Sequence, residues 1–168
     1  MLGLGEYILL EIISEMIFPQ DVQQFLVFKQ YLHSLQRKHG MGIADASCSF
    51  AVGKGPSEDG NKKKTVRYFW DGELDHITNI THGSGSYEDG QRISAIVDMT
   101  SNPRKVVFYV DDIEQPNYVI KIPSEIRFWA CTYGISSSFK VTKFQRLIQF
   151  TSQRDAGSKA LKWGKSWE

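Results

Sequence analysis

Apolar side chains in the first forty residues recur at helical spacing. Five of them fall at positions i, i+3, i+4, i+7 and i+8 and so share one helix face: Leu9, Ile12, Ile13, Met16 and Ile17. Pro19 should end this helix, and Asp21 followed by Gln24 has the form of a capping box for a second one. We therefore expect two α-helices over residues 8–38, in an N-terminal segment of residues 1–40.

After Gly40 the apolar positions alternate with polar ones, which is the period of a β-strand. Asp71-Gly72 and Asp111-Asp112 separate strand-like runs and are typical hairpin turns. The expected strands cover residues 41–47, 65–70, 73–77, 91–99, 104–110, 113–122, 126–133 and 138–144. Many short strands with regular turns predict an antiparallel β-sandwich over residues 41–148. Residues 149–168 show no sustained period, and we expect a mobile tail there.

Composition fits one soluble globular domain with no strong field around it. The chain has 168 residues, of which 41% are hydrophobic and 23% charged. Its formal net charge is +1, so we expect neither nucleic acid nor a membrane as a partner. Residues 1–18 carry three glutamates and have the pattern of neither a signal peptide nor a membrane span.

The stretch GKGPSEDGNKKKT, residues 53–65, superficially resembles a phosphate-binding loop. Gly55 and Gly60 have the required separation, but Asn61 stands where the lysine should follow. The next residues, TVRYFW, are rich in β-branched and aromatic side chains, so they predict a strand where the motif needs a helix. We interpret residues 53–65 as a charged, solvated loop between two strands.

No set of residues has the spacing of a catalytic or metal site. Cys48 and Cys131 form neither a disulfide framework nor a zinc pattern, which fits a reducing compartment and predicts a cytoplasmic or nuclear protein. His76 and His82 lie close in sequence, but only Asp71 and Asp75 accompany them. We expect no metal, no cofactor and no enzymatic activity.

The order of the strands resembles the SPRY domain, most closely its divergent forms in unicellular eukaryotes. The resemblance covers about residues 41–144 and is carried by MGIAD, YFWDGEL, DGQRISAIVDM and the run from RKVVFYV to SSSFKV. It implies a concanavalin-A-like sandwich, or jelly roll, that binds proteins or peptides through its loops. Such domains normally begin with further strands, one of them rich in aromatic residues. Here helix is predicted in their place, so either the helices cover the sheet or the chain is a fragment.

The segment LLEIISEMIFPQDVQQFLVFKQ, residues 9–30, has a weaker resemblance to an F-box. Its leading Leu-Pro is replaced by Leu-Leu, and a third helix is not evident. A true F-box would imply an adaptor that docks a ubiquitin ligase while the sandwich selects the substrate. Plain packing of two amphipathic helices is the alternative.

The candidate partner-binding residues lie in three loops, near residues 68–72, 83–90 and 133–138. They are Tyr68, Trp70, Asp71, Tyr133 and Ser136. Aromatic side chains are enriched in binding surfaces, although those of the 65–70 strand also fit a core, and the GISSS loop also fits an ordinary connection. The expected function is a non-enzymatic protein-interaction module. The alternative is a carbohydrate-binding or glycan-cleaving jelly roll, which for cleavage needs two carboxylates on one concave face, Asp98 among the candidates.

Overall fold

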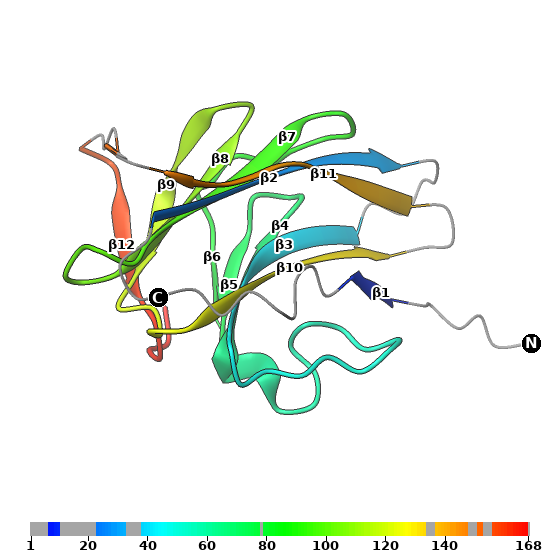
Figure 1. Cartoon of the computed structure of the whole chain (residues 1–168), viewed down its shortest axis with the longest axis horizontal. Helices are drawn as coiled ribbons and strands as arrows, with labels where there is room; N and C mark the ends of the chain where they lie inside the picture. Colours follow the sequence, from blue (N-terminus) through cyan, green and yellow to red (C-terminus); the bar gives the residue numbers. More distant parts are fainter. Residues whose placement is uncertain are drawn as a thin grey trace, which may run out of the picture.

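Two β-sheets lie face to face in the computed structural model (Figure 1). The structure describes residues 7–10, 23–32, 38–77, 79–133, 137–147, 151–152 and 156–167. Each sheet has six strands among these residues. In Figure 1 the upper layer contains β2, β7 and β11, and the lower layer contains β3 and β10. The expected β-sandwich is therefore confirmed.

In spatial order, the first sheet consists of β1 (Tyr7–Leu10), β10 (Ile126–Tyr133), β3 (Lys38–Asp45), β4 (Thr65–Phe69), β5 (Leu74–His76) and β6 (Asn79–Thr81). The second consists of β11 (Ser137–Leu147), β2 (Gln23–Leu32), β7 (Arg92–Asp98), β8 (Lys105–Val110), β9 (Ile113–Ile120) and β12 (Lys159–Lys162). A short 3-10 helix, η1 (Asn61–Lys64), precedes β4. The described strand pairs are antiparallel except β9 with β12, which is parallel.

The main core fills the space between the sheets. Alternate residues of β7 point into it, as their spacing predicts, and Ile93, Ala95 and Val97 are buried there. Tyr68 from β4 and Phe108 from β8 meet across the layers with ring centroids 5.3 Å apart. Burying an aromatic side chain of this kind stabilises the fold by about 1.5–3 kcal/mol.

A second apolar cluster lies beneath residues 46–64, beside β3 and β10. Ala44, Cys48, Trp129 and Cys131 are buried together, and Phe50 packs against them. The Cys48 thiol donates a hydrogen bond to the carbonyl of Lys64, which ties the start of this segment to its end. The segment does join two strands, and β4 follows η1 directly, as the argument against a phosphate-binding loop predicted.

The prediction of helix over residues 8–38 is wrong wherever the structure describes that region. Residues 7–10 form β1 and residues 23–32 form β2, while 11–22 and 33–37 lie outside the described residues. The backbone of β2 pairs with β11 on one side and β7 on the other. Its sequence QQFLVFKQYL is rich in aromatic residues, and pairing in the middle of a sheet overrode its helical spacing. Strands therefore occupy the place where helix was expected.

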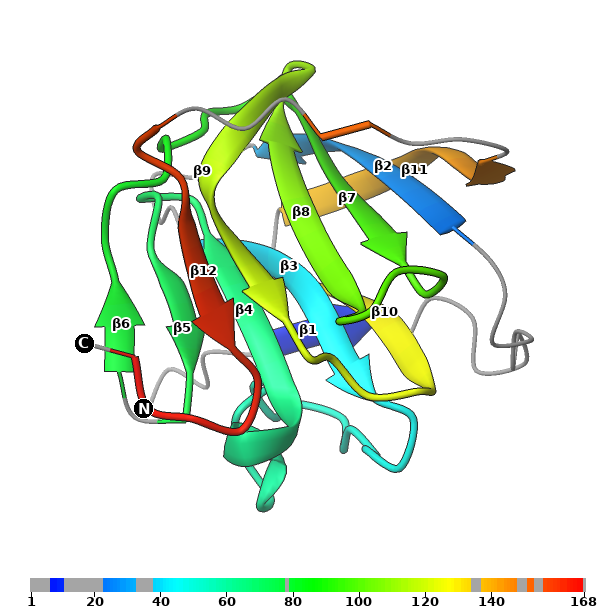
Figure 2. The same cartoon turned by 90° about the vertical axis from the view of Figure 1, so that its left-hand side faces the viewer.

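The expectation of a mobile tail after residue 148 is also corrected for the described residues. Residues 159–162 form β12 beside β9, as Figure 2 shows in red. Leu161 and Trp167 join the main core, and Trp167 is only 3% exposed. This segment is short and polar, so its sequence shows no period, yet its apolar side chains pack into the core between the sheets.

Candidate functional site

Three connections meet at one end of the sandwich, which we call the loop end: residues 70–73, 82–91 and 111–112. The register pairs Gly40 with both Phe69 and Cys131, so β4 and β10 finish near the same place. The side chain of Gln91 donates a hydrogen bond of 2.9 Å to Asp111, which joins the second and third connections. The predicted binding loops around residues 68–72 and 83–90 are also neighbours, because the N–H of Tyr87 donates to the carbonyl of Trp70.

Tyr87 anchors the middle of the loop end. Its backbone N–H donates a 2.8 Å hydrogen bond to the carbonyl of Trp70, and its hydroxyl lies 3.2 Å from the carbonyl of Tyr68. The side chain is 2% exposed and its ring packs 5.3 Å from that of Tyr68. Burial raises the pKa of Tyr87 well above its ordinary value, so it stays a neutral donor.

Two buried amide side chains of β9 hold residues 82–85 from below. Gln115 Oε1 accepts a 2.5 Å hydrogen bond from the N–H of Gly85. Asn117 Nδ2 donates to the carbonyl of His82 at 3.1 Å and to the hydroxyl of Ser84 at 3.2 Å. Buried polar groups with satisfied hydrogen bonds fix a single arrangement, so the backbone of this segment is preformed.

Gly72 lets the first connection approach the second closely. Its φ of +85° lies in the left-handed region, and a Cβ there would lie 2.3 Å from the carbonyl oxygen of Ser84. Only glycine meets both requirements without displacement of one loop. This glycine is also the tip residue of the predicted Asp71-Gly72 hairpin, which β4 and β5 confirm.

The exposed side chains of the loop end are mainly acidic. Asp71, Glu88, Asp89, Asp111 and Asp112 are all exposed. Arg92 forms ion pairs with the last two. Burial and the nearby charge of Asp71 raise the pKa of Glu73, which is consistent with a site rich in negative charge.

The five predicted binding residues have different outcomes. Tyr68 is 0% exposed, and its hydroxyl donates to the carbonyl of Gly85, so it is a core residue that supports the loop from behind and cannot contact a partner. Trp70 is half-buried and packs against the core, and Asp71 is exposed at the hairpin tip. Tyr133 is the last residue of β10, where the structure describes only the backbone, and Ser136 lies outside the described residues.

Sequence reasoning missed the residues that shape the loop end. Gln115 and Asn117 occupy inward positions of β9, where alternation predicts apolar residues. An amide residue at such a position is the sequence signal that could have identified them. Tyr87 is a lone aromatic residue in the small, polar stretch HGSGSYEDG, and such a residue commonly anchors a loop.

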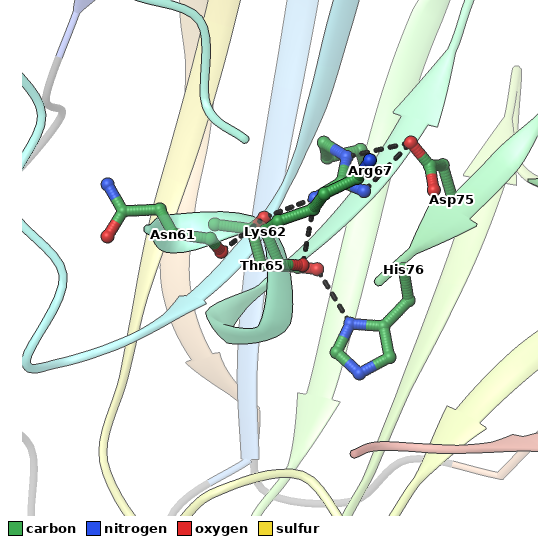
Figure 3. A network of polar contacts seen from close by, with 6 residues as sticks. All are labelled: Asn61, Lys62, Thr65, Arg67, Asp75 and His76. Carbon is green, nitrogen blue, oxygen red and sulfur yellow. Dashed lines mark hydrogen bonds and ion pairs between the residues drawn. The ribbon is translucent and has the colours of Figure 1, made fainter. Parts of the chain in front are cut away.

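The opposite end of the sandwich contains a buried polar network (Figure 3). Arg67, 1% exposed, contacts Asp75 through Nε at 3.0 Å and through a terminal nitrogen at 2.8 Å. It also donates to the hydroxyl of Thr65 at 2.5 Å and to the carbonyl of Lys62 at 3.3 Å. These contacts join β4, β5 and η1.

His76 connects this network to the C-terminal segment. Its Nδ1 lies 2.8 Å from the carbonyl of Thr65, and its Nε2 lies 2.8 Å from the N–H of Gly164. A carbonyl accepts and an N–H donates, so the neutral ring with its proton on Nδ1 satisfies both. Burial lowers the pKa of His76, which favours this neutral form. His82 is far from this site, 76% exposed at the loop end.

Among the described residues, no three His, Cys, Asp or Glu side chains are grouped to hold a metal ion. No helix in the described ranges has the length and hydropathy to cross a membrane. Cys48 and Cys131 are both unpaired thiols.

The fold is similar to that of solved structures. It superposes on the crystal structure of a human SPRY domain with a TM-score of 0.62 and 14% identity, covering 82% of this chain and 84% of that one. The chain has the fold of a SPRY domain. The SPRY domain of human HERC1 gives a TM-score of 0.52, also at 14% identity, with 87% and 86% covered. No family model matches the sequence, and no curated protein matches it either. The SPRY resemblance of residues 41–144 is thus confirmed at the level of the fold.

Proposed function

We propose that this SPRY fold is a non-enzymatic protein-interaction module and that its loop end binds a peptide or a protein. The observation that supports this most directly is the preformed loop of residues 82–87, held by Gln115, Asn117 and the two buried tyrosines. A surface that is already ordered loses little conformational entropy on binding, so more of the contact energy appears as affinity.

Two side chains of the first connection carry the proposed contact. Trp70 is half-buried, so its ring is held by the core while part of it stays accessible, as in an interface anchor. Asp71 stands next to it and is exposed. With Glu88 and Asp89 on the neighbouring connection, it favours partner segments that carry lysine or arginine.

Selection from a displayed random-peptide library tests this proposal, with the wild-type chain as bait. Trp70→Ala should weaken binding of the selected peptides by at least about 2 kcal/mol, or about 30-fold, because an aromatic anchor contributes most of the binding energy of a small interface. Asp71→Lys leaves the core unchanged and should lower the affinity for basic peptides by about tenfold. Lys140→Gln, an exposed change on β11, is the matched control and should alter nothing. Selected peptides that bind both loop variants like wild type would overturn the proposal.

Neither alternative gains support from the described residues. The Asp98 carboxylate accepts hydrogen bonds from Thr100 and Ser101 and pairs with Lys105 at 3.6 Å, so it caps a turn. Burial raises its pKa and these hydrogen bonds lower it, with a net value below the ordinary one, which does not suit a general acid. The F-box adaptor needs a helix over residues 23–30, and these belong to β2.

A further inference from the structure

Five exposed lysines gather at the end of the sandwich opposite the loop end. Lys62, Lys63 and Lys64 form the last three residues of η1, while Lys162 and Lys165 flank the turn after β12. We call this set the lysine face. The two groups are about a hundred residues apart in sequence, yet the turn after β12 lies beside η1 in Figure 2. From the sequence, Lys62, Lys63 and Lys64 were interpreted only as part of a solvated loop.

The His76 ring brings the two groups together. One nitrogen binds the carbonyl of Thr65, directly after η1, and the other binds the N–H of Gly164, between Lys162 and Lys165. The rings of Trp163 and Trp167 pack against His76, each with a centroid distance of 5.0 Å. One imidazole therefore spans the space between the segments, and the lysines on both sides share one surface.

The backbone on each side of His76 is fixed by further buried contacts. The carbonyl of Lys62 accepts hydrogen bonds from Arg67 and from the N–H of Ile77 at 3.2 Å. The carbonyl of Lys162 accepts one of 2.9 Å from Trp167 Nε1. These bonds fix the backbone of both segments, so the five lysines extend from one rigid surface and an anion bound there would reduce the repulsion between their like charges.

Two of the nearby carboxylates are engaged with other groups, and Asp59, two positions before η1, is exposed. Asp75 pairs with Arg67, and Glu58 pairs with Lys54 at 3.3 Å and also accepts from the N–H of Gly55. In the described part of the chain, no ion pair involves any lysine of the lysine face; the one polar contact of these amines is that of Lys64 with the Ser47 hydroxyl at 3.2 Å. Within these ranges, the charges of the five lysines are therefore not neutralised by ion pairs.

We propose that the lysine face is a second interaction surface, which binds an acidic segment of a partner protein. Ammonium groups on flexible stems suit carboxylates spaced irregularly along an extended peptide. Nucleic acid fits less well, because the net charge of the chain is only +1 and the Trp163 and Trp167 rings are used against His76. A surface made of one 3-10 turn and one β-strand end is also small for a membrane.

Fluorescence anisotropy with the full chain and a labelled peptide of Glu and Ser, about ten residues long and about 33 Å when extended, tests this. The peptide should bind at low ionic strength and weaken severalfold as the Debye length falls from about 30 to about 8 Å. A peptide with Gln in place of Glu should not bind. Lys62→Gln with Lys63→Gln, and separately Lys162→Gln with Lys165→Gln, should each weaken binding by about three- to tenfold. Lys140→Gln should leave it unchanged.

Three outcomes would overturn the proposal. The first is an acidic peptide that does not bind at low salt. The second is equal or tighter binding of a single-stranded oligonucleotide of the same length, or of vesicles with anionic lipid, which would assign the surface to that ligand instead. The third is binding that one lysine pair abolishes and the other leaves unchanged, because the surface would then not be composite. All substituted lysines are exposed, so folding is not at risk, and the loop-end experiment is unaffected by each result.

Discussion

The two ends of the sandwich are held by different kinds of buried contact. At the loop end, the neutral amides of Gln115 and Asn117 and the phenol of Tyr68 bind the backbone of residues 82–87. At the other end, the charged pair of Arg67 and Asp75 and the titratable ring of His76 bind η1 and the C-terminal segment. Neutral hydrogen bonds each contribute about 1 kcal/mol and do not depend on pH near neutrality, whereas a buried charge is far more sensitive to loss of its partner. The loop end should therefore tolerate single substitutions and changes of pH better than the opposite end does.

The largest expected effect is at Arg67. Arg67→Ala leaves the largely buried carboxylate of Asp75 without its ion pair and removes one of the two hydrogen bonds of the Thr65 hydroxyl, and it should lower the free energy of unfolding by about 3–5 kcal/mol. Urea denaturation measures this. Arg92→Ala at the loop end is the matched control, because its ion pairs with Asp111 and Asp112 are exposed and should be worth less than about 1 kcal/mol. An equal loss of unfolding free energy in the two variants would contradict the proposed difference between the two ends.

Gly72→Ala should have the largest effect at the loop end. The new Cβ would meet the Ser84 carbonyl, and φ is positive, so we expect a loss of about 2–3 kcal/mol and displacement of the neighbouring connection. Gly90 has a similar φ of +81° but nothing within 4 Å of its Cβ position. Gly90→Ala should therefore cost only about 1 kcal/mol. The difference between their thermal midpoints measures the close contact itself, and identical midpoints would contradict it.

The His76 end should make the stability of the chain depend on pH. Because the pKa of His76 is lower in the folded chain than in the unfolded one, the unfolded chain binds the proton first as the pH falls. Stability is then complete above about pH 6.5 and is lost below it, by at most about 1.4 kcal/mol per pH unit. Urea midpoints at pH 7.5 and 5.5, about one unit on either side of 6.5, test this, with tryptophan fluorescence as readout.

Two variants separate His76 from other groups that titrate in the same range. His76→Gln should be less stable at neutral pH but should lack most of the decline below about pH 6.5. His82→Gln, at the exposed position, should follow the wild-type profile within about 0.5 kcal/mol. An undiminished decline in the His76 variant would mean that other carboxylates or histidines cause it.

The smallest expected effect is the loss of one neutral hydrogen bond. Tyr87→Phe keeps the ring against Tyr68 and removes the hydroxyl that donates to the Tyr68 carbonyl. We expect a loss of about 1 kcal/mol, with no change in its pH dependence between pH 5.5 and 7.5, one unit or so around the ordinary histidine pKa. Hydrogen exchange of the Tyr87 amide, bound to the Trp70 carbonyl, should stay slow if the loop keeps its shape.

Sequence could predict the strands whose signals are local. In β7 through β9 the alternation of apolar residues and the turn at Asp111-Asp112 agree with each other, and the structure confirms both. The run FLVF in β2 fits a helix face as well as a strand, and only its pairing with β7 and β11 decides between them. The strand β12 is too short to show a period at all.

The sites were harder to predict than the strands because their contacts join distant residues. Gly85 and Gln115 are 30 positions apart, and His76 and Gly164 are 88 apart. Nothing in the local pattern marks a histidine in a short hairpin as the partner of a glycine near the end of the chain. Local turn and aromatic signals made Asp71 and Trp70 candidates, which they remain, whereas no local signal marked the residues that position them.

The cluster beneath residues 46–64 contains two thiols of low reactivity. Burial raises the pKa of Cys131 to about 12, and burial together with the nearby charge of Asp45 raises that of Cys48. Because only a thiolate attacks an alkylating reagent, each cysteine can react solely while its cover is open. Because both thiols lie in the cluster beneath residues 46–64, their alkylation rates should report how often this segment separates from β3 and β10.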